Sequence, residues 1–190
     1  MKPTRWAGRW ILLAWLAVAI PAGAQPVVEL EATARVIPSG LQIEAQGELV
    51  FPDAGLGGED AVLMAGQSPT FLLIDARGDA SAGWHVTLTA SDLSDPQGER
   101  IPATLLRCSA TGGKLERLAG LPVDSQFGPA ETGLEGALSS GLKVVFADPG
   151  FGRGSYTYQP AAFSFQLTVP ASASPGTYRG LITADLVAGP

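Results

Sequence analysis

The chain is poor in the residues that most often carry enzyme chemistry. Its 190 residues include one histidine, His85, and one cysteine, Cys108. A serine or cysteine nucleophile needs a neighbouring base, and His85 is the sole imidazole that could serve. The sequence has no G-x-S-x-G elbow, and a zinc site would need an unusual set of carboxylates. These shortages argue against an enzyme and indicate neither a cofactor nor a metal.

The single cysteine also excludes an internal disulfide. Cys108 ends the apolar stretch IPATLLRC, and free cysteine is among the most buried residue types. We therefore expect a buried, inert thiol.

Basic residues are few, and three of the twelve stand at the N-terminus. Lys2, Arg5 and Arg9 surround the start of an apolar run, Trp10–Ile20, which the small residues of 22–24 (AGA) follow. This is the pattern of a secretory signal. The run makes about 16 Å of helix, too short to span a bilayer. We expect residues 1–24 to be a signal peptide, and an exported protein (extracellular, at the cell surface or periplasmic) with no membrane-spanning segment after cleavage.

The remaining part, residues 25–190, is long enough for one domain with a core. It holds nine basic and eighteen acidic residues, so its net charge is 9 − 18 = −9. Nucleic acids and anionic lipid surfaces are bound largely through Lys and Arg, so this balance argues against both.

Apolar and polar residues alternate in several segments separated by Gly, Pro, Ser and Asp clusters. Such alternation is typical of strands with one wet face. The segments with this pattern or with a short apolar run are 29–36, 41–46, 70–74, 84–91, 102–108, 142–146, 163–169 and 177–187. They predict an all-β fold, a single antiparallel β-sandwich with long Gly-rich loops. We expect residues 110–140 to be a long excursion, with a weak helical signal in 130–140, and 148–155 to be a second loop.

Residues 72–90 contain the one tryptophan after position 15. Trp84 shares a strand face with Val86, Leu88 and Ala90, which predicts a core anchor, and His85 then faces solvent. The functional alternative is an exposed ring that stacks on a sugar. The Gly-containing connection from 76 to 83 predicts that FLLID (71–75) and WHVTLTA (84–90) are neighbouring antiparallel strands.

Two further patterns resemble ligand sites. Asp92, Asp95 and Glu99 could hold calcium, but their spacing matches no calcium loop, and a solvated turn explains them better. The tripeptide Arg77-Gly78-Asp79 could be read by a receptor, but three residues match by chance often.

Residues 27–190 resemble the WxL domain of bacterial cell-surface proteins. The stretch FLLIDARGDASAGWHVTLTASDL resembles that family's central signature, and FQLTVPASASPGTYRGLITADLVAGP resembles its C-terminal end. The positions that carry the resemblance are Asp75, Arg77, Gly78, Gly83, Trp84, Val86, Pro170, Gly176, Tyr178 and Leu186.

The resemblance implies an exported, non-catalytic β-rich module that binds the cell wall non-covalently, with peptidoglycan as its partner. The chain departs from the family at two positions. Val86 stands where the first Trp-x-Leu motif has Leu, and Ala184 replaces the tryptophan of the second. Two other hypotheses remain, a periplasmic or pilus-type subunit that pairs its edge strands with a partner protein, and a hydrolase.

Overall fold

The computed structural model describes residues 40–189 apart from residues 56, 79–81 and 162–163. The expected signal peptide and the expected strand at 29–36 lie outside the described residues. No helix among the residues that the structure describes is long and apolar enough to cross a membrane.

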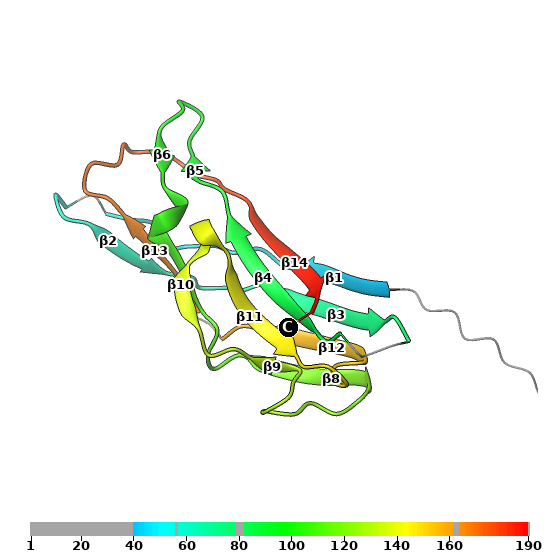
Figure 1. Ribbon diagram of the computed structural model, residues 1–190. Coiled ribbons are helices and arrows are strands. Elements are labelled where there is room, and N and C mark those ends of the chain that lie inside the picture. The colour runs from blue at the N-terminus through cyan, green and yellow to red at the C-terminus, as the bar shows by residue number, and fades with distance from the viewer. Residues whose placement is uncertain (1–39, 56, 79–81, 162–163, 190) are drawn as a thin grey trace, which may run out of the picture. The chain divides into compact units, whose positions relative to one another are not determined.

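The described residues form strands and two short 3-10 turns, so the all-β prediction is confirmed (Figure 1). The strands are β1 (Gly40–Gln46), β2 (Ala61–Met64), β3 (Thr70–Ala76), β4 (Trp84–Ala90), β5 (Leu93–Ser94), β6 (Arg100–Ile101), β7 (Leu106–Ser109), β8 (Lys114–Gly120), β9 (Ala130–Glu131), β10 (Glu135–Ala137), β11 (Leu142–Ala147), β12 (Gly154–Gln159), β13 (Phe165–Val169) and β14 (Ile182–Ala188). The 3-10 turns are η1 (Ala103–Leu105) and η2 (Leu138–Ser140).

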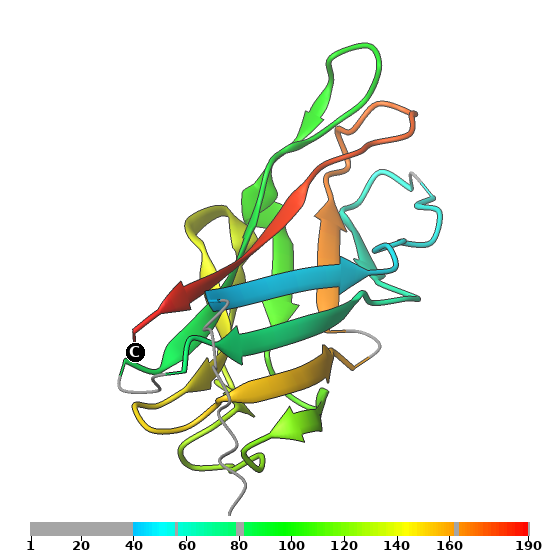
Figure 2. The same ribbon diagram turned by 90° about the vertical axis from the view of Figure 1, so that its right-hand side faces the viewer.

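The described residues form three four-stranded antiparallel sheets. The first has the order β1-β3-β12-β8, the second β10-β7-β13-β2 and the third β14-β4-β11-β9, while β5 and β6 form a separate hairpin. The first and third sheets pack face to face, and between them the rings of Trp84 and Tyr156 meet with centroids 6.5 Å apart. Figure 2 shows β1, β3 and β12 running across the direction of β13. The sheets therefore enclose one core, as a sandwich does.

Strict alternation of side chains explains which residues fill this core. In β3, Phe71 and Leu73 are buried and their neighbours are half-buried. In β4, Trp84, Val86 and Leu88 are almost completely buried. Removing apolar area from water is the main favourable term in folding. The alternating apolar residues therefore determine which face of each sheet is turned toward the core.

The prediction that β3 and β4 pair with each other is wrong. β3 pairs with β1 and β12 in the first sheet, whereas β4 pairs with β14 and β11 in the third. The connection 77–83 carries the chain from one layer to the other. Both strands bury an apolar face, and crossing between layers lets those faces meet.

The expected long excursion at 110–140 is also wrong, because it contains β8, β9 and β10. β8 is an edge strand with exposed charged residues, so it lacks the apolar alternation that identifies a strand. The weak helical signal at 130–140 corresponds to η2 alone, and β12 begins inside the expected loop 148–155. In the expected strand 102–108 the first residues form η1, and the expected strand 177–187 begins only at Ile182.

Candidate functional site

The connection between β3 and β4 is fastened by an ion pair. Asp75 is on the buried face of β3, and its side chain is fully covered. The Arg77 guanidinium donates from Nε to Oδ1 and from Nη2 to Oδ2 of this carboxylate, both at 2.9 Å. Nη2 also donates to the carbonyl oxygen of Gly83 at 2.8 Å. Arg77 therefore joins the two ends of the connection, and such bidentate pairs are geometrically specific.

Two glycines of the same motif allow the turn. Gly78 and Gly83 have φ values of +78° and +63°, in the region that other residues rarely adopt. A Cβ atom at Gly83 would also overlap the carbonyl oxygen of Ala147 on β11. The absence of a side chain at Gly83 therefore lets the backbone pass close to the end of β11 as it enters β4.

Trp84 is a core residue. It is 1% exposed, and its indole Nε1 donates a 3.0 Å hydrogen bond to the carbonyl oxygen of Gly152. Burial of the ring with its polar atom satisfied is the arrangement expected for a structural tryptophan. The alternative of Trp84 as an exposed sugar platform is therefore wrong.

His85 is on the opposite face of β4, as the alternation predicts, but it does not simply face solvent. The ring is half-buried, and Nδ1 lies 2.9 Å from the carbonyl oxygen of Gly189. The sequence could not reveal this contact because it depends on β14 lying beside β4.

The two segments that resemble Trp-x-Leu motifs, 84–86 and 184–186, are neighbours in the third sheet. β14 pairs antiparallel with β4 in a continuous register that places Leu186 opposite Val86 and Ala184 opposite Leu88. Val86 is buried, whereas Ala184 and Leu186 are half-buried and pack against the core. The sequence motifs therefore meet in space, and both contribute to packing.

The remaining positions of the resemblance are near the end of β13 and the segment before β14. Pro170 is half-buried, and its carbonyl accepts the N–H of Ala173 at 2.9 Å. The Tyr178 hydroxyl donates to the carbonyl oxygen of Ser174 at 2.9 Å, which closes the turn before the last strand. Gly176 lies against Asp95, where a Cβ atom would sit 3.0 Å from Oδ2.

The carboxylates at 92–99 shape the β5–β6 hairpin. Asp95 is 8% exposed, and its Oδ1 accepts the N–H groups of Gln97 and Glu99 at 2.9 and 2.8 Å. Asp92 Oδ1 accepts the N–H of Ala103. Between this hairpin and the segment before β14 lies an open pocket of about 480 Å³, lined by Ser94, Asp95, Pro96, Thr177 and Arg179. In the part of the chain that the structure describes, no three His, Cys, Asp or Glu side chains are arranged to hold a metal.

Cys108 is buried, as predicted. Burial, followed by the nearby Glu131 charge, raises the pKa of the thiol to about 12. Burial also raises the pKa of Tyr158, whose hydroxyl donates to Oε1 of Glu131 at 2.9 Å. A buried thiol that stays protonated is a poor nucleophile, which agrees with the expectation of an inert thiol.

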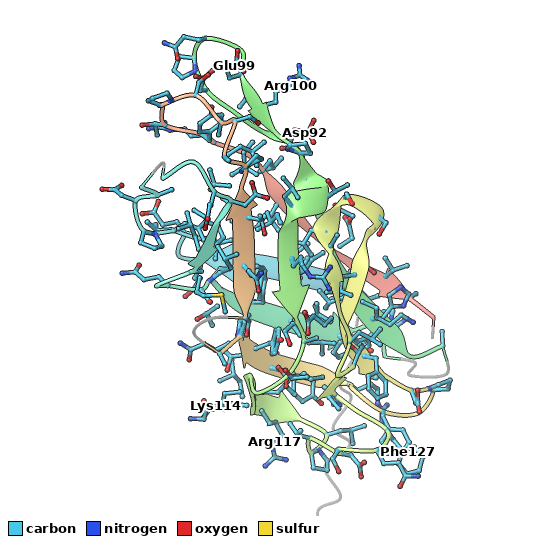
Figure 3. All side chains as sticks on the ribbon, turned by 90° about the vertical axis from the view of Figure 1, so that its left-hand side faces the viewer. Asp92, Glu99, Arg100, Lys114, Arg117 and Phe127 are labelled. Carbon is cyan, nitrogen blue, oxygen red and sulfur yellow. The ribbon has the colours of Figure 1, made fainter. Side chains whose placement is uncertain are left out.

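Sequence reasoning missed an aromatic pair in two loops. The rings of Phe127 and Phe151 stack with centroids 4.9 Å apart and an angle of 18° between their planes, and Phe127 is 38% exposed. Figure 3 places Phe127 at the opposite end of the molecule from Glu99 and Arg100. Both rings lie in Gly- and Pro-rich segments 24 positions apart, so only the fold brings them together.

The Phe127 loop is held in place by backbone hydrogen bonds. Asp124 Oδ1 accepts the N–H groups of Gln126 and Phe127, and these bonds lower the pKa of that carboxyl. The carbonyl of Phe127 accepts the N–H of Asp148, which precedes the Phe151 loop, at 2.8 Å. The rings are therefore presented on an ordered support.

Neither a protein-family model nor a curated protein matches this chain. Among solved structures, a family 123 glycoside hydrolase from Clostridium perfringens, described for glycolipid glycan hydrolysis, is similar with a TM-score of 0.29 and 16% identity. The similarity covers 67% of this chain and 18% of that one, so the chain spans less than a fifth of the hydrolase. A likeness of this size says nothing about what the chain does.

Proposed function

We propose that this protein is an exported, non-catalytic module of the cell surface that binds peptidoglycan non-covalently, as its resemblance to WxL domains implies. Since Trp84 is buried, the contact with the wall must use another surface. The observation that supports the proposal best is the stacked pair of Phe127 and Phe151.

An exposed aromatic face suits a glycan. Sugar rings carry a face of C–H bonds that packs on an aromatic face, while their hydroxyls bind polar groups at its rim. Phe127 and Phe151 supply the apolar face. Gln126 and Arg153 are exposed in the same two loops, and Asp124 is half-buried beside them. An apolar surface with a few polar groups around it is the general composition of a small-ligand site.

Co-sedimentation with insoluble peptidoglycan tests this proposal. We expect the purified chain to pellet with the wall material and to stay bound at ~0.5 M salt, where exposed charges are screened within a few ångströms. Phe127→Ala should weaken binding about tenfold, the usual loss for a central aromatic contact. Leu118→Ala is the matched control, because Leu118 is an exposed apolar side chain (59%) on β8.

The outcomes separate three cases. Absence of any co-sedimentation would reject wall binding. Release by salt would indicate ion exchange instead of a specific site. Binding that Phe127→Ala leaves unchanged would place the contact away from the aromatic pair.

A further inference from the structure

β14 is an edge strand with one side unpaired among the residues that the structure describes. It is the outermost strand of the third sheet and pairs only with β4 among the described residues. Figure 2 shows it crossing the near side of the molecule next to β1, with which it is in contact without a strand pairing. Edge strands are usually protected against further pairing by charges, proline, bulges or short length.

Among the edge strands that the structure describes, β14 and β1 have the least of this protection. β1 also has seven residues, an uninterrupted register and one charge, but its exposed face carries the polar residues Gln42, Glu44 and Gln46. β8 carries Lys114, Glu116 and Arg117, and its register is interrupted at Leu118. β2, β9 and β10 have four, two and three residues. β14 has seven residues, an uninterrupted register and one charged side chain, Asp185. The two exposed apolar residues Leu181 (67%) and Val187 (43%) lie at its ends.

The hydrogen bonds of β14 show which backbone groups are free for a partner. The carbonyl of Leu181 accepts the N–H of Ser91, and the N–H of Gly189 donates to the carbonyl of Gly83. Backbone groups along a strand alternate in direction, so the odd-numbered residues face β4. The N–H and C=O groups of Ile182, Ala184 and Leu186 therefore point away from the sheet.

We propose that β14 pairs antiparallel with β14 of a second copy, about a two-fold axis at Ala184. In this register Ala184 bonds to Ala184 of the other copy, and Ile182 bonds to Leu186, so all three outward residues are satisfied. Thr183 then lies opposite Asp185, and Leu181 opposite Val187. All four of these side chains are exposed on the outer face.

This register is the one that matches the side chains. An axis at Asp185 would place two carboxylates directly opposite each other, which destabilises a strand pair. The axis at Ala184 instead places the Thr183 hydroxyl opposite the Asp185 carboxylate and Leu181 opposite Val187. Each of these two contacts occurs twice because of the two-fold symmetry. The second copy is thus a self-complementary partner, as a two-fold interface requires.

Sedimentation equilibrium of the exported chain tests the proposal. A single strand pair is a small interface, so we expect a monomer–dimer equilibrium with a Kd on the order of 10–100 µM. Thr183→Glu places like charges opposite each other at two positions and should raise the Kd about tenfold, while Thr183→Lys faces Asp185 and should lower it about threefold. The double variant Thr183→Glu/Asp185→Lys restores opposite charges and should restore the dimer.

Val62→Lys is the control on another edge, since Val62 is 58% exposed on β2, and it should leave the Kd unchanged. Circular dichroism would establish that each variant keeps its fold. A chain that stays monomeric at ~1 mM, far above the expected Kd, would overturn the proposal. Glu and Lys variants at position 183 that shift the Kd equally would overturn it as well.

Discussion

At the scale of the residue, Trp84 shows how one side chain joins distant parts of the molecule. Its ring packs against Tyr156 on the opposite sheet, and its indole N–H holds the carbonyl of Gly152 in the loop that carries Phe151. The alternating sequence of β4 was enough to predict that this ring is buried. The hydrogen bond to Gly152 could not be predicted, because the two residues are 68 positions apart.

Trp84→Ala should lower the free energy of unfolding by about 3–5 kcal/mol, the usual cost of truncating a buried aromatic ring. Urea unfolding followed by far-ultraviolet circular dichroism measures this loss. In a protein of residues 25–190, where Trp84 is the one tryptophan, its fluorescence should be blue-shifted and poorly quenched by iodide. Phe127→Ala should cost much less, about 1 kcal/mol or below, because that ring is partly in water. Equal losses for the two variants would contradict this assignment of the core.

At the scale of the element, the ion pair of Asp75 and Arg77 fastens the crossing from the first sheet to the third. The Asp75 side chain is fully buried and that of Arg77 is 18% exposed. Removing Arg77 leaves the buried Asp75 carboxylate without its ion-pair partner, which costs more than the pair contributes.

Arg77→Ala should therefore destabilise the protein by about 3–5 kcal/mol. Asp75→Ala removes the buried carboxylate, so the double variant Asp75→Ala/Arg77→Ala should lose less than the sum of the two single losses, by about 1–3 kcal/mol. Thermal or urea unfolding of the four proteins gives this coupling energy. Additive losses would mean that the two side chains act independently.

The connection between β3 and β4 also shows which features of the fold could not be predicted from the sequence. β3 and β4 were predicted as strands because each alternates apolar and polar residues, but alternation does not say which strand pairs with which. Edge strand β8 was missed because its exposed charges hide the pattern. The Phe127–Phe151 pair was missed because contacts between loops depend on the fold that carries them.

At the scale of the whole molecule, the reactivity of the buried Cys108 thiol is a measure of global unfolding. The residue is 2% exposed, and burial keeps the pKa of its thiol far above the value of about 8.5 in an unfolded chain. A pKa raised by folding contributes stability that is complete below the unfolded value and is lost as pH rises through the folded one. Stability should therefore decline above about pH 8.5, towards the folded pKa of about 12.

We expect Cys108 to react with a thiol reagent at pH 8 only through unfolded molecules. The alkylation rate should rise with urea in parallel with the fraction unfolded, measured by circular dichroism. Cys108→Ala should remove the alkylation and reduce the loss of stability between pH 8 and 10. Rapid labelling of the native protein would show instead a local opening at β7.

The hydrogen bonds by which Arg77 joins Asp75 to Gly83 have a practical consequence for protein engineering. The Arg77 guanidinium contacts Asp75 before the loop and Gly83 after it, so these hydrogen bonds hold the two ends of the loop together. The entropic cost of bringing the ends of a loop together grows only slowly with the number of residues in the loop. An epitope tag or a reporter peptide inserted between Gly78 and Gly83 should therefore leave both sheets in place, which makes this connection the natural position for a graft.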